Sequence, residues 1–434
     1  MPEDPSLLLA SPHVGLDPRP DVRAGLLTRR TFRTFLRRPV AGPTRAGVLD
    51  AARWGWTAAD SDPVRLIVLD DPDLKRRLFA LTRESKAISN HWEGLFRPAG
   101  LRGYVQHWTA TPFCIAVCAD PGAGPTHIHN NWNHHLAAAA AAENLALAAR
   151  AYGMALVMYS HFSQEKLKRL LDVPFSWDTI GVMGVGWPDL RRTNPKVLAA
   201  SLTRLPLAEL VAEERYRAPA PAALAADGGS DGRVPELLET VTGVRWVTRF
   251  RDEPVPMSSV VEILRAGQWA PSAGNFQPVR YVLLRDRARL ARLGDLARES
   301  VEISAHWVPA YRGSAGEHPD WRAVPLAIAL ISDPTRGGPH IHGEATHMHA
   351  GGLAAQNMAV MAHGLGLGTT LVTHWVEEQV KTLIDCPRAW DLIGVMPFGV
   401  PAERPPRNPR PLDDFVYQDR FGRPWRAAQG EADA

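Results

Sequence analysis

The chain carries one long pattern twice, and this repeat limits its fold more than any other feature of the sequence. Residues 83–92 read RESKAISNHW, and residues 298–307 read RESVEISAHW, an offset of 215. Further along the offset is 213: residues 177–183 read WDTIGVM, and residues 390–396 read WDLIGVM. Solenoid units repeat about every 20–50 residues, so a repeat of this length is a whole domain. The sequence therefore predicts two related domains fused into a pseudo-dimer.

The repeat also sets the predicted domain boundaries. Copy one is expected over residues 21–202 and copy two over residues 234–411. Residues 203–233 connect them, and their content of Ala, Pro and Gly is typical of a linker. Residues 412–434 form a C-terminal tail with aromatic residues among polar ones. We expect this tail to pack across the other copy, and fraying is the alternative.

Composition excludes several classes of protein. With 434 residues, of which 45% are hydrophobic, the chain is long enough for two domains with full cores. Its 49 basic and 46 acidic residues nearly balance, so no nucleic-acid partner is expected. Three cysteines are too few for a disulfide framework. The sequence shows no signal peptide, and its longest apolar stretch, residues 136–149, is too short to cross a membrane. These features predict a cytoplasmic protein.

Within each copy, helical and strand patterns alternate. In copy two, residues 258–269 carry apolar residues at helical spacing, and residues 279–284 and 323–331 are typical of strands. Residues 351–364 form a long expected helix rich in small residues, and residues 392–400 a last strand. Helices and strands that interleave in this way predict an α+β fold, with a central sheet flanked by helices in each copy.

Four motifs resemble the FMN-dependent nitroreductase superfamily. Residues 30–35 (RTFRTF) are similar to its N-terminal arginine signature, and residues 270–278 (APSAGNFQP) to its Pro-Ser turn. Residues 355–368 resemble its interface helix with the glycines that follow, and residues 394–401 resemble its closing strand. The likeness covers nearly the whole chain in both copies. It implies a nitroreductase-like fold in which each sheet is mostly antiparallel.

The resemblance also implies a cofactor site. In this family FMN lies between two intertwined subunits; one supplies arginines to the phosphate, and the other supplies Ser and Asn from the turn. Copy one has Thr57 and Asp60 where copy two has Ser272 and Asn275, so one complete FMN site is expected, and two working sites are the alternative. Guanidinium groups suit a phosphate because they form paired, charge-assisted hydrogen bonds. The expected FMN ligands are Arg30, Thr31, Arg33, Arg191 and Arg192 from copy one, and Ser272, Asn275 and Gln277 from copy two.

The histidines are a second unusual feature. Sixteen occur, and ten of them form repeat-matched pairs. The spacing of His127 and His129 places two imidazoles on one side of an extended segment, and His134 follows at a helix start. Three convergent imidazoles suit zinc, iron or copper. The nitroreductase pattern does not require them, and helix capping or interface hydrogen bonds are the alternative. The predicted metal ligands are His127, His129 and His134, with His340, His342 and His347 in copy two.

Two further histidines are candidates for catalysis. His161 and His374 follow a strand in matching positions, where the resemblance places a residue whose backbone N–H approaches the flavin. An imidazole titrates near neutral pH, so it suits a proton donor or acceptor beside the flavin. The alternative is a half-buried histidine that packs against Phe162 or Trp375.

Together these features predict an FMN-dependent oxidoreductase that acts on a small organic substrate, aromatic or biosynthetic, between the two copies. NAD(P)H or oxygen is the expected redox partner, and a nicotinamide is expected to bind transiently, because the sequence has no Rossmann phosphate loop. A monomer or weak oligomer is expected, because the dimer interface of the family is internal here. Two alternatives stay open: a metal-dependent oxidase or oxygenase that has weakened or lost flavin, and a flavin-storage protein without turnover.

Overall fold

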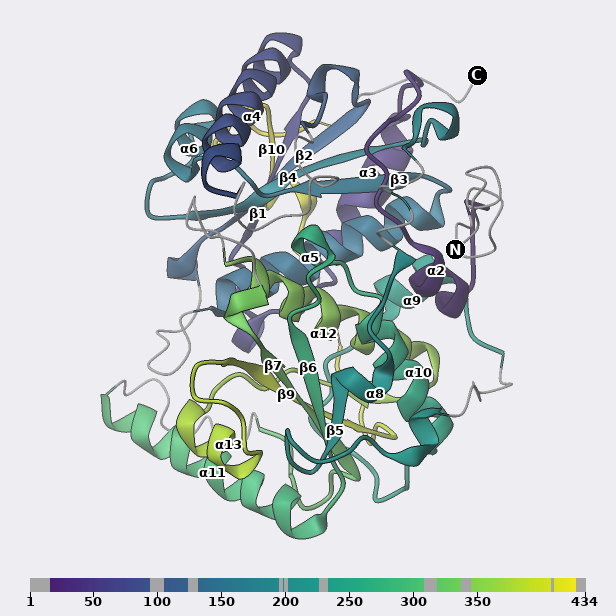
Figure 1. Ribbon diagram of the computed structural model, residues 1–434, viewed down its shortest axis with the longest axis vertical. Helices are drawn as coiled ribbons and strands as arrows, with labels where there is room; N and C mark the ends of the chain where they lie inside the picture. Colours follow the sequence, from purple (N-terminus) through teal and green to yellow (C-terminus); the bar gives the residue numbers. More distant parts are fainter. Residues whose placement is uncertain are drawn as a thin grey trace.

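The computed structural model describes residues 16–93, 105–123, 132–194, 198, 202–225, 233–307, 318–336, 345–406 and 410–426. These residues form two five-stranded sheets, one centred on each copy of the repeat. Helices flank both sheets, and the two copies lie one above the other in Figure 1. The predicted α+β fold, with one central sheet per copy, is confirmed.

Copy one builds its sheet in the order β10-β1-β2-β4-β3, and the strands of the copy itself pair antiparallel with their neighbours. Odd and even residues along β1 point into different apolar clusters, so helices cover both faces of the sheet. The strands are β1 (Val64–Leu69), β2 (Phe113–Ala119), β3 (Ala155–Tyr159) and β4 (Asp178–Gly186). The helices are α2 (Val22–Thr28), α3 (Gly42–Ala52), α4 (Pro72–Glu93), α5 (Asn133–Ala151) and α6 (Gln164–Leu171).

Copy two repeats this arrangement in the order β5-β6-β7-β9-β8. Even the irregularities match, because the ladder shifts register between Val117 and Cys118 in one copy and between Leu330 and Ile331 in the other. The strands are β6 (Val279–Leu284), β7 (Leu326–Ser332), β8 (Gly368–Thr369) and β9 (Asp391–Gly399). The helices are α9 (Leu237–Gly243), α10 (Met257–Gln268), α11 (Arg287–Trp307), α12 (Thr346–Gly364) and α13 (Glu377–Leu383).

Each copy gives its last strand to the sheet of the other. Strand β5 (Val211–Glu213) pairs parallel with β6, and β10 (Val416–Gln418) pairs parallel with β1. The C-terminal tail therefore packs across copy one, as expected. The description of residues 203–233 as a linker needs correction, because this segment also holds α8 (Leu207–Leu210) and β5. The domain boundaries themselves stay a prediction.

The central contact between the copies is made by α5 and α12. The two helices run side by side in the same direction, since Ala139 lies against Gly352 and Asn144 against Gln356. A side chain at Gly352 would come within 2.8 Å of the Ala139 Cβ, so small residues permit this close approach. Nearly every residue of both helices is buried. Among the described residues, the structure contains no helix with the length and apolar character of a membrane span.

Candidate functional site

A pair of arginines shares one aromatic ring where the N-terminal part of copy one meets copy two. Arg30 follows α2 and is only 4% exposed. Its guanidinium carbon lies 4.1 Å from the ring centroid of Trp269, which ends α10 in copy two. The guanidinium carbon of Arg204 lies 4.8 Å from the same ring. Guanidinium groups interact favourably with an indole face, so Trp269 holds both cations at the interface between the copies.

The guanidinium of Arg30 is incompletely satisfied. Its Nη1 donates to the carbonyl oxygen of Arg29 at 2.7 Å, whereas its Nε and Nη2 are buried and have no hydrogen-bond partner among the described residues. Burial, together with the nearby charges of Arg29, Arg204 and Arg150, lowers the pKa of Arg30 to about 8. Buried donors next to several cations match the chemistry of an oxyanion such as phosphate.

One carboxylate lies among these arginines. Glu143 of α5 is buried, and its Oε1 lies 3.4 Å from the Nε of Arg29. Burial raises the pKa of Glu143, and the charge of Arg29 opposes this rise. Arg150, also on α5, uses its Nη1 to bind the carbonyl oxygen of Asp17 at 2.6 Å. The group therefore has more positive than negative charge in a buried place, and an anion would balance it.

The Pro-Ser turn of copy two faces the same interface. The Oγ of Ser272 accepts a hydrogen bond from the Gln277 backbone N–H at 2.9 Å, which closes the turn. Asn275 and Gln277 both have positive φ angles, of 58° and 51°, a conformation that asparagine adopts more readily than most residues. The Oδ1 of Asn275 accepts from the Nη1 of Arg204 at 2.9 Å. The structure thus joins Arg30 and Asn275 through Trp269 and Arg204.

Arg204 is the site residue that the sequence analysis missed. It lies in the segment described as a linker, where no residue was considered for the site. Its Asn275 contact is reinforced by neighbours, because the Oε1 of Gln277 accepts from the backbone N–H of Leu205 at 2.8 Å. The signal in the sequence is an Arg-Leu-Pro run directly before α8, which leads into the strand β5 that pairs with copy two.

The other predicted phosphate ligands have less support. Arg191 and Arg192 are exposed, and their backbone N–H groups bind the Oδ1 of Asp189. Thr31 forms a single parallel bridge with Leu156 in β3, and Arg33 is half-buried. The part that these four residues take in a cofactor site stays a prediction.

The matching position on the other side of the interface keeps the arginine-on-tryptophan contact. Arg245 lies 5.3 Å from the ring centroid of Trp54. Its Nη1 donates to three backbone carbonyl oxygens, those of Thr242, Gly243 and Val244. A cavity of about 560 Å³ opens beside it, lined by Arg245, His363, Glu403 and Arg404 among others. Next to Ser272, by contrast, the cavity is about 20 Å³.

The two candidate catalytic histidines have different surroundings. The Nε2 of His374 lies 2.8 Å from the Oγ of Ser304, a buried residue of α11. His161 is half-buried after β3. Neither arrangement tests a catalytic role, which stays a prediction.

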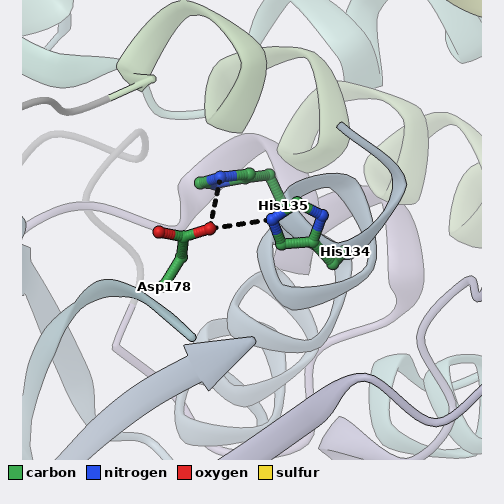
Figure 2. A group of neighbouring side chains, drawn as sticks. All are labelled: His134, His135 and Asp178. Carbon is green, nitrogen blue, oxygen red and sulfur yellow. Dashed lines mark hydrogen bonds and ion pairs between the residues drawn. The ribbon is translucent and has the colours of Figure 1, made fainter. Parts of the chain in front are cut away.

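Of the predicted metal ligands, His127, His129, His340 and His342 lie outside the described residues. The other two each bind an aspartate that begins a strand. The Nε2 of His134 lies 2.9 Å from Asp178, and that of His347 lies 2.8 Å from Asp391. His134 and Asp178 form a cluster with His135, which the sequence analysis did not consider (Figure 2).

Comparison with known proteins identifies one family for both copies. The family model described as the nitroreductase family matches residues 26–187 and 245–400, one segment in each copy. A 5,6-dimethylbenzimidazole synthase of Rhodospirillum rubrum is 27% identical over 169 residues, which cover 37% of this chain and 80% of that protein. An FMN reductase [NAD(P)H] of Bacillus subtilis is 24% identical over 193 residues, which cover 43% and 74%. A solved nitroreductase-like protein from Desulfovibrio desulfuricans, in complex with FMN, is 26% identical with a TM-score of 0.34, covering 44% of this chain and 97% of that one.

Proposed function

Because the chain belongs to the nitroreductase family, we propose that it is an FMN-dependent oxidoreductase with one strong FMN site, in which Arg30 and Arg204 hold the phosphate. The observation that carries this proposal is the guanidinium of Arg30, whose Nε and Nη2 are buried without hydrogen-bond partners among the described residues. The relatives support the choice of cofactor, since one is named as an FMN reductase and another was solved with FMN.

The residues on this side of the interface fit a phosphomonoester. Arg30 and Arg204 both lie against the ring of Trp269, and the carboxylate of Glu143 neutralises only part of the positive charge around them. When bound, FMN supplies the redox chemistry, and the protein supplies orientation and electrostatics. The cavity beside Ser272 is much smaller than FMN, so binding on this side requires side chains such as Arg204 to rearrange.

For the substrate we propose a small organic molecule, with NAD(P)H as the reductant. The names of the relatives support both parts: one is a synthase of an aromatic base, and another uses NAD(P)H. A monomer is proposed because α5 and α12, which bring the two copies together, are already paired inside one chain.

The test compares FMN with riboflavin, which lacks only the phosphate. Flavin fluorescence titration of the purified protein should give about one FMN per chain, with riboflavin bound more weakly. Replacing Arg30 or Arg204 by alanine should weaken FMN binding by roughly 100-fold, since charge-assisted hydrogen bonds are lost, and should change riboflavin binding little. Arg245→Ala is the matched control and should leave the main site unchanged.

Several outcomes count against the proposal. Two equivalents of FMN bound with similar affinity contradict the single site. A strong effect of Arg245→Ala, with none of Arg30→Ala, would place the phosphate in the larger cavity on the other side. Absence of any reduction of the bound flavin by NADPH or NADH under anaerobic conditions would contradict the proposed reductant, and a flavin-storage role would then fit better.

A further inference from the structure

Two histidines and an aspartate converge at the N-terminal end of α5. His134 and His135 lie in the first turn of this helix, and Asp178 begins β4. The Oδ2 of Asp178 lies 2.9 Å from the Nε2 of His134 and 3.3 Å from the Nε2 of His135. Figure 2 shows both imidazole rings directed at the same carboxylate oxygen. The three possible ligand atoms all lie within 4.8 Å of one another.

These distances are close to the spacing in a metal site. When zinc is bound tetrahedrally with bonds of about 2.0–2.1 Å, neighbouring ligand atoms are about 3.3 Å apart. The two Nε2-to-Oδ2 distances, 2.9 and 3.3 Å, are therefore compatible with an ion placed between the three atoms after small side-chain shifts. Two imidazoles and one carboxylate are a ligand set of catalytic zinc sites and of non-haem iron sites.

Groups around the cluster hold two of its members in place. The Nδ1 of His135 lies 3.0 Å from the Nε2 of His349, so the ring nitrogen that faces away from Asp178 is also engaged. Such a contact to the second nitrogen orients a metal-binding imidazole. On the other oxygen of the carboxylate, the Nζ of Lys168 lies 3.9 Å from the Oδ1 of Asp178. The positive charge of Lys168 disfavours a bound cation. However, Lys168 lies near Oδ1, so Oδ2 is the oxygen directed at the two imidazoles.

The two copies differ at this place in a complementary way. Copy two has Met348 where copy one has His135, and copy one has Leu136 where copy two has His349. His135 and His349, which both lack a repeat partner, meet each other between α5 and α12. At the matching place copy two has the pair of His347 and Asp391. Among the described residues, a group of three such ligands occurs in copy one alone.

We propose that His134, His135 and Asp178 bind one divalent first-row transition metal ion per chain, with His349 as a positioning residue for His135. The ion would be zinc or ferrous iron, which both accept this mixture of nitrogen and oxygen ligands. This ligand set differs from the three-histidine sets predicted from the sequence, and it does not depend on flavin binding. With three protein ligands, the ion keeps at least one position for water or another molecule.

The test uses untagged, full-length protein that has been stripped of metal with a chelator. Co²⁺ is the probe, because its visible absorption reports coordination, and Zn²⁺ is then used to displace it. One Co²⁺ per chain, with the absorption of a four- or five-coordinate ion, is the expected result. His135→Met, which copies the residue of copy two, and Asp178→Asn should each weaken binding by about 10- to 100-fold. His349→Phe should weaken it less, and His347→Ala should leave it unchanged.

A double variant, His127→Ala with His129→Ala, separates this site from the one predicted from the sequence. Retained binding supports the proposal, whereas loss of Co²⁺ in this variant but not in His135→Met overturns it. Absence of a Co²⁺ spectrum and of bound zinc in the wild type also overturns it. If a variant does not fold, a rise in the melting temperature of the wild type on addition of Zn²⁺ decides: the proposal requires such a rise, and no rise counts against it.

Discussion

The two sides of the interface share one contact and differ in nearly everything around it. Arg30 lies over Trp269 on one side, and Arg245 lies over Trp54 on the other. Around Arg30 the neighbours are further arginines and a carboxylate. Around Arg245 the guanidinium is already used on backbone carbonyls, and the matching positions of Arg29, Arg150 and Glu143 hold Val244, His363 and Gln356.

This difference shows that the larger cavity lies on the Arg245 side, whereas the excess positive charge lies on the Arg30 side. The cavity at Arg245 is large enough for a ligand, but Glu403 borders it and occupies the backbone N–H groups of Thr248 and Arg249. The Arg30 side has little free volume, but the Nε and Nη2 of Arg30 have no hydrogen-bond partner among the described residues. For binding a phosphate, unsatisfied donors matter more than a preformed cavity. Moving side chains to make room costs less free energy than leaving buried cations without partners.

Separating the two copies should have the largest effect, because it removes both sides of the interface at once. Expressed alone, residues 1–233 would expose the buried face of α5 and leave β5 without its partner strand, and residues 234–434 would do the same for α12 and β10. We expect each piece to be insoluble or aggregated, and the two to form a 1:1 complex when they are produced together. Light scattering after size-exclusion chromatography measures this. A soluble, folded monomer of residues 234–434 would show that the pseudo-dimer contact is not required.

Replacing Arg30 by methionine should have the second-largest effect. It should raise the stability of the ligand-free protein and weaken FMN binding. Without ligand, the variant should be more stable by about 1 kcal/mol, because a buried cation without a full set of partners is removed. FMN binding should fall strongly. Urea denaturation with and without FMN measures both. Arg245→Met, whose parent side chain is satisfied by carbonyl groups, is the matched control and should not be stabilised.

The difference in free energy of unfolding between the wild type and Arg30→Met should depend on pH, because the pKa of Arg30 is lowered to about 8 in the folded chain. Below pH 8 the side chain is charged in both the folded and unfolded states, so the full free-energy cost of burying the charged guanidinium is present. Above pH 8 the folded chain holds fewer protons than the unfolded chain, so the free energy of unfolding of the wild type rises with pH relative to Arg30→Met. The gap between the two proteins should therefore shrink between pH 7 and pH 9.5. A constant gap would show that Arg30 stays protonated throughout.

Much of the fold could be predicted because its signals are local or repeated. The duplication and the α+β class follow from patterns that occur twice, and the packing of the tail across copy one follows from its spaced aromatic residues; the structure confirms all three. The family is confirmed by the model that matches one segment in each copy, and the name of a relative agrees with the expected oxidoreductase activity and with FMN. Ser272 and Asn275 lie within one short turn, so their proximity needed no knowledge of the tertiary structure.

The missed residues share a physical reason. Arg204 precedes a three-residue strand that pairs with β6, about 70 positions later, and so short a strand has no periodicity to reveal it. The repeat does not single out His135 and His349, because these two histidines occur at positions where the copies differ. A contact between helices that are far apart in sequence decides their role, and no local pattern encodes it.

The smallest effect is expected from Glu143→Gln, which gives copy one the residue that copy two has at this position, Gln356. The change keeps the size of the side chain and removes its charge, so the arginines lose the buried counter-ion that Glu143 supplies. The ligand-free protein should become less stable, and FMN should bind a few-fold more tightly, since its phosphate then replaces the missing negative charge. Gln356→Glu on the other side is the matched control and should not improve binding. If Glu143→Gln weakens FMN binding instead, the carboxylate orients Arg29 rather than competing with the phosphate, and the charge argument for this side is wrong.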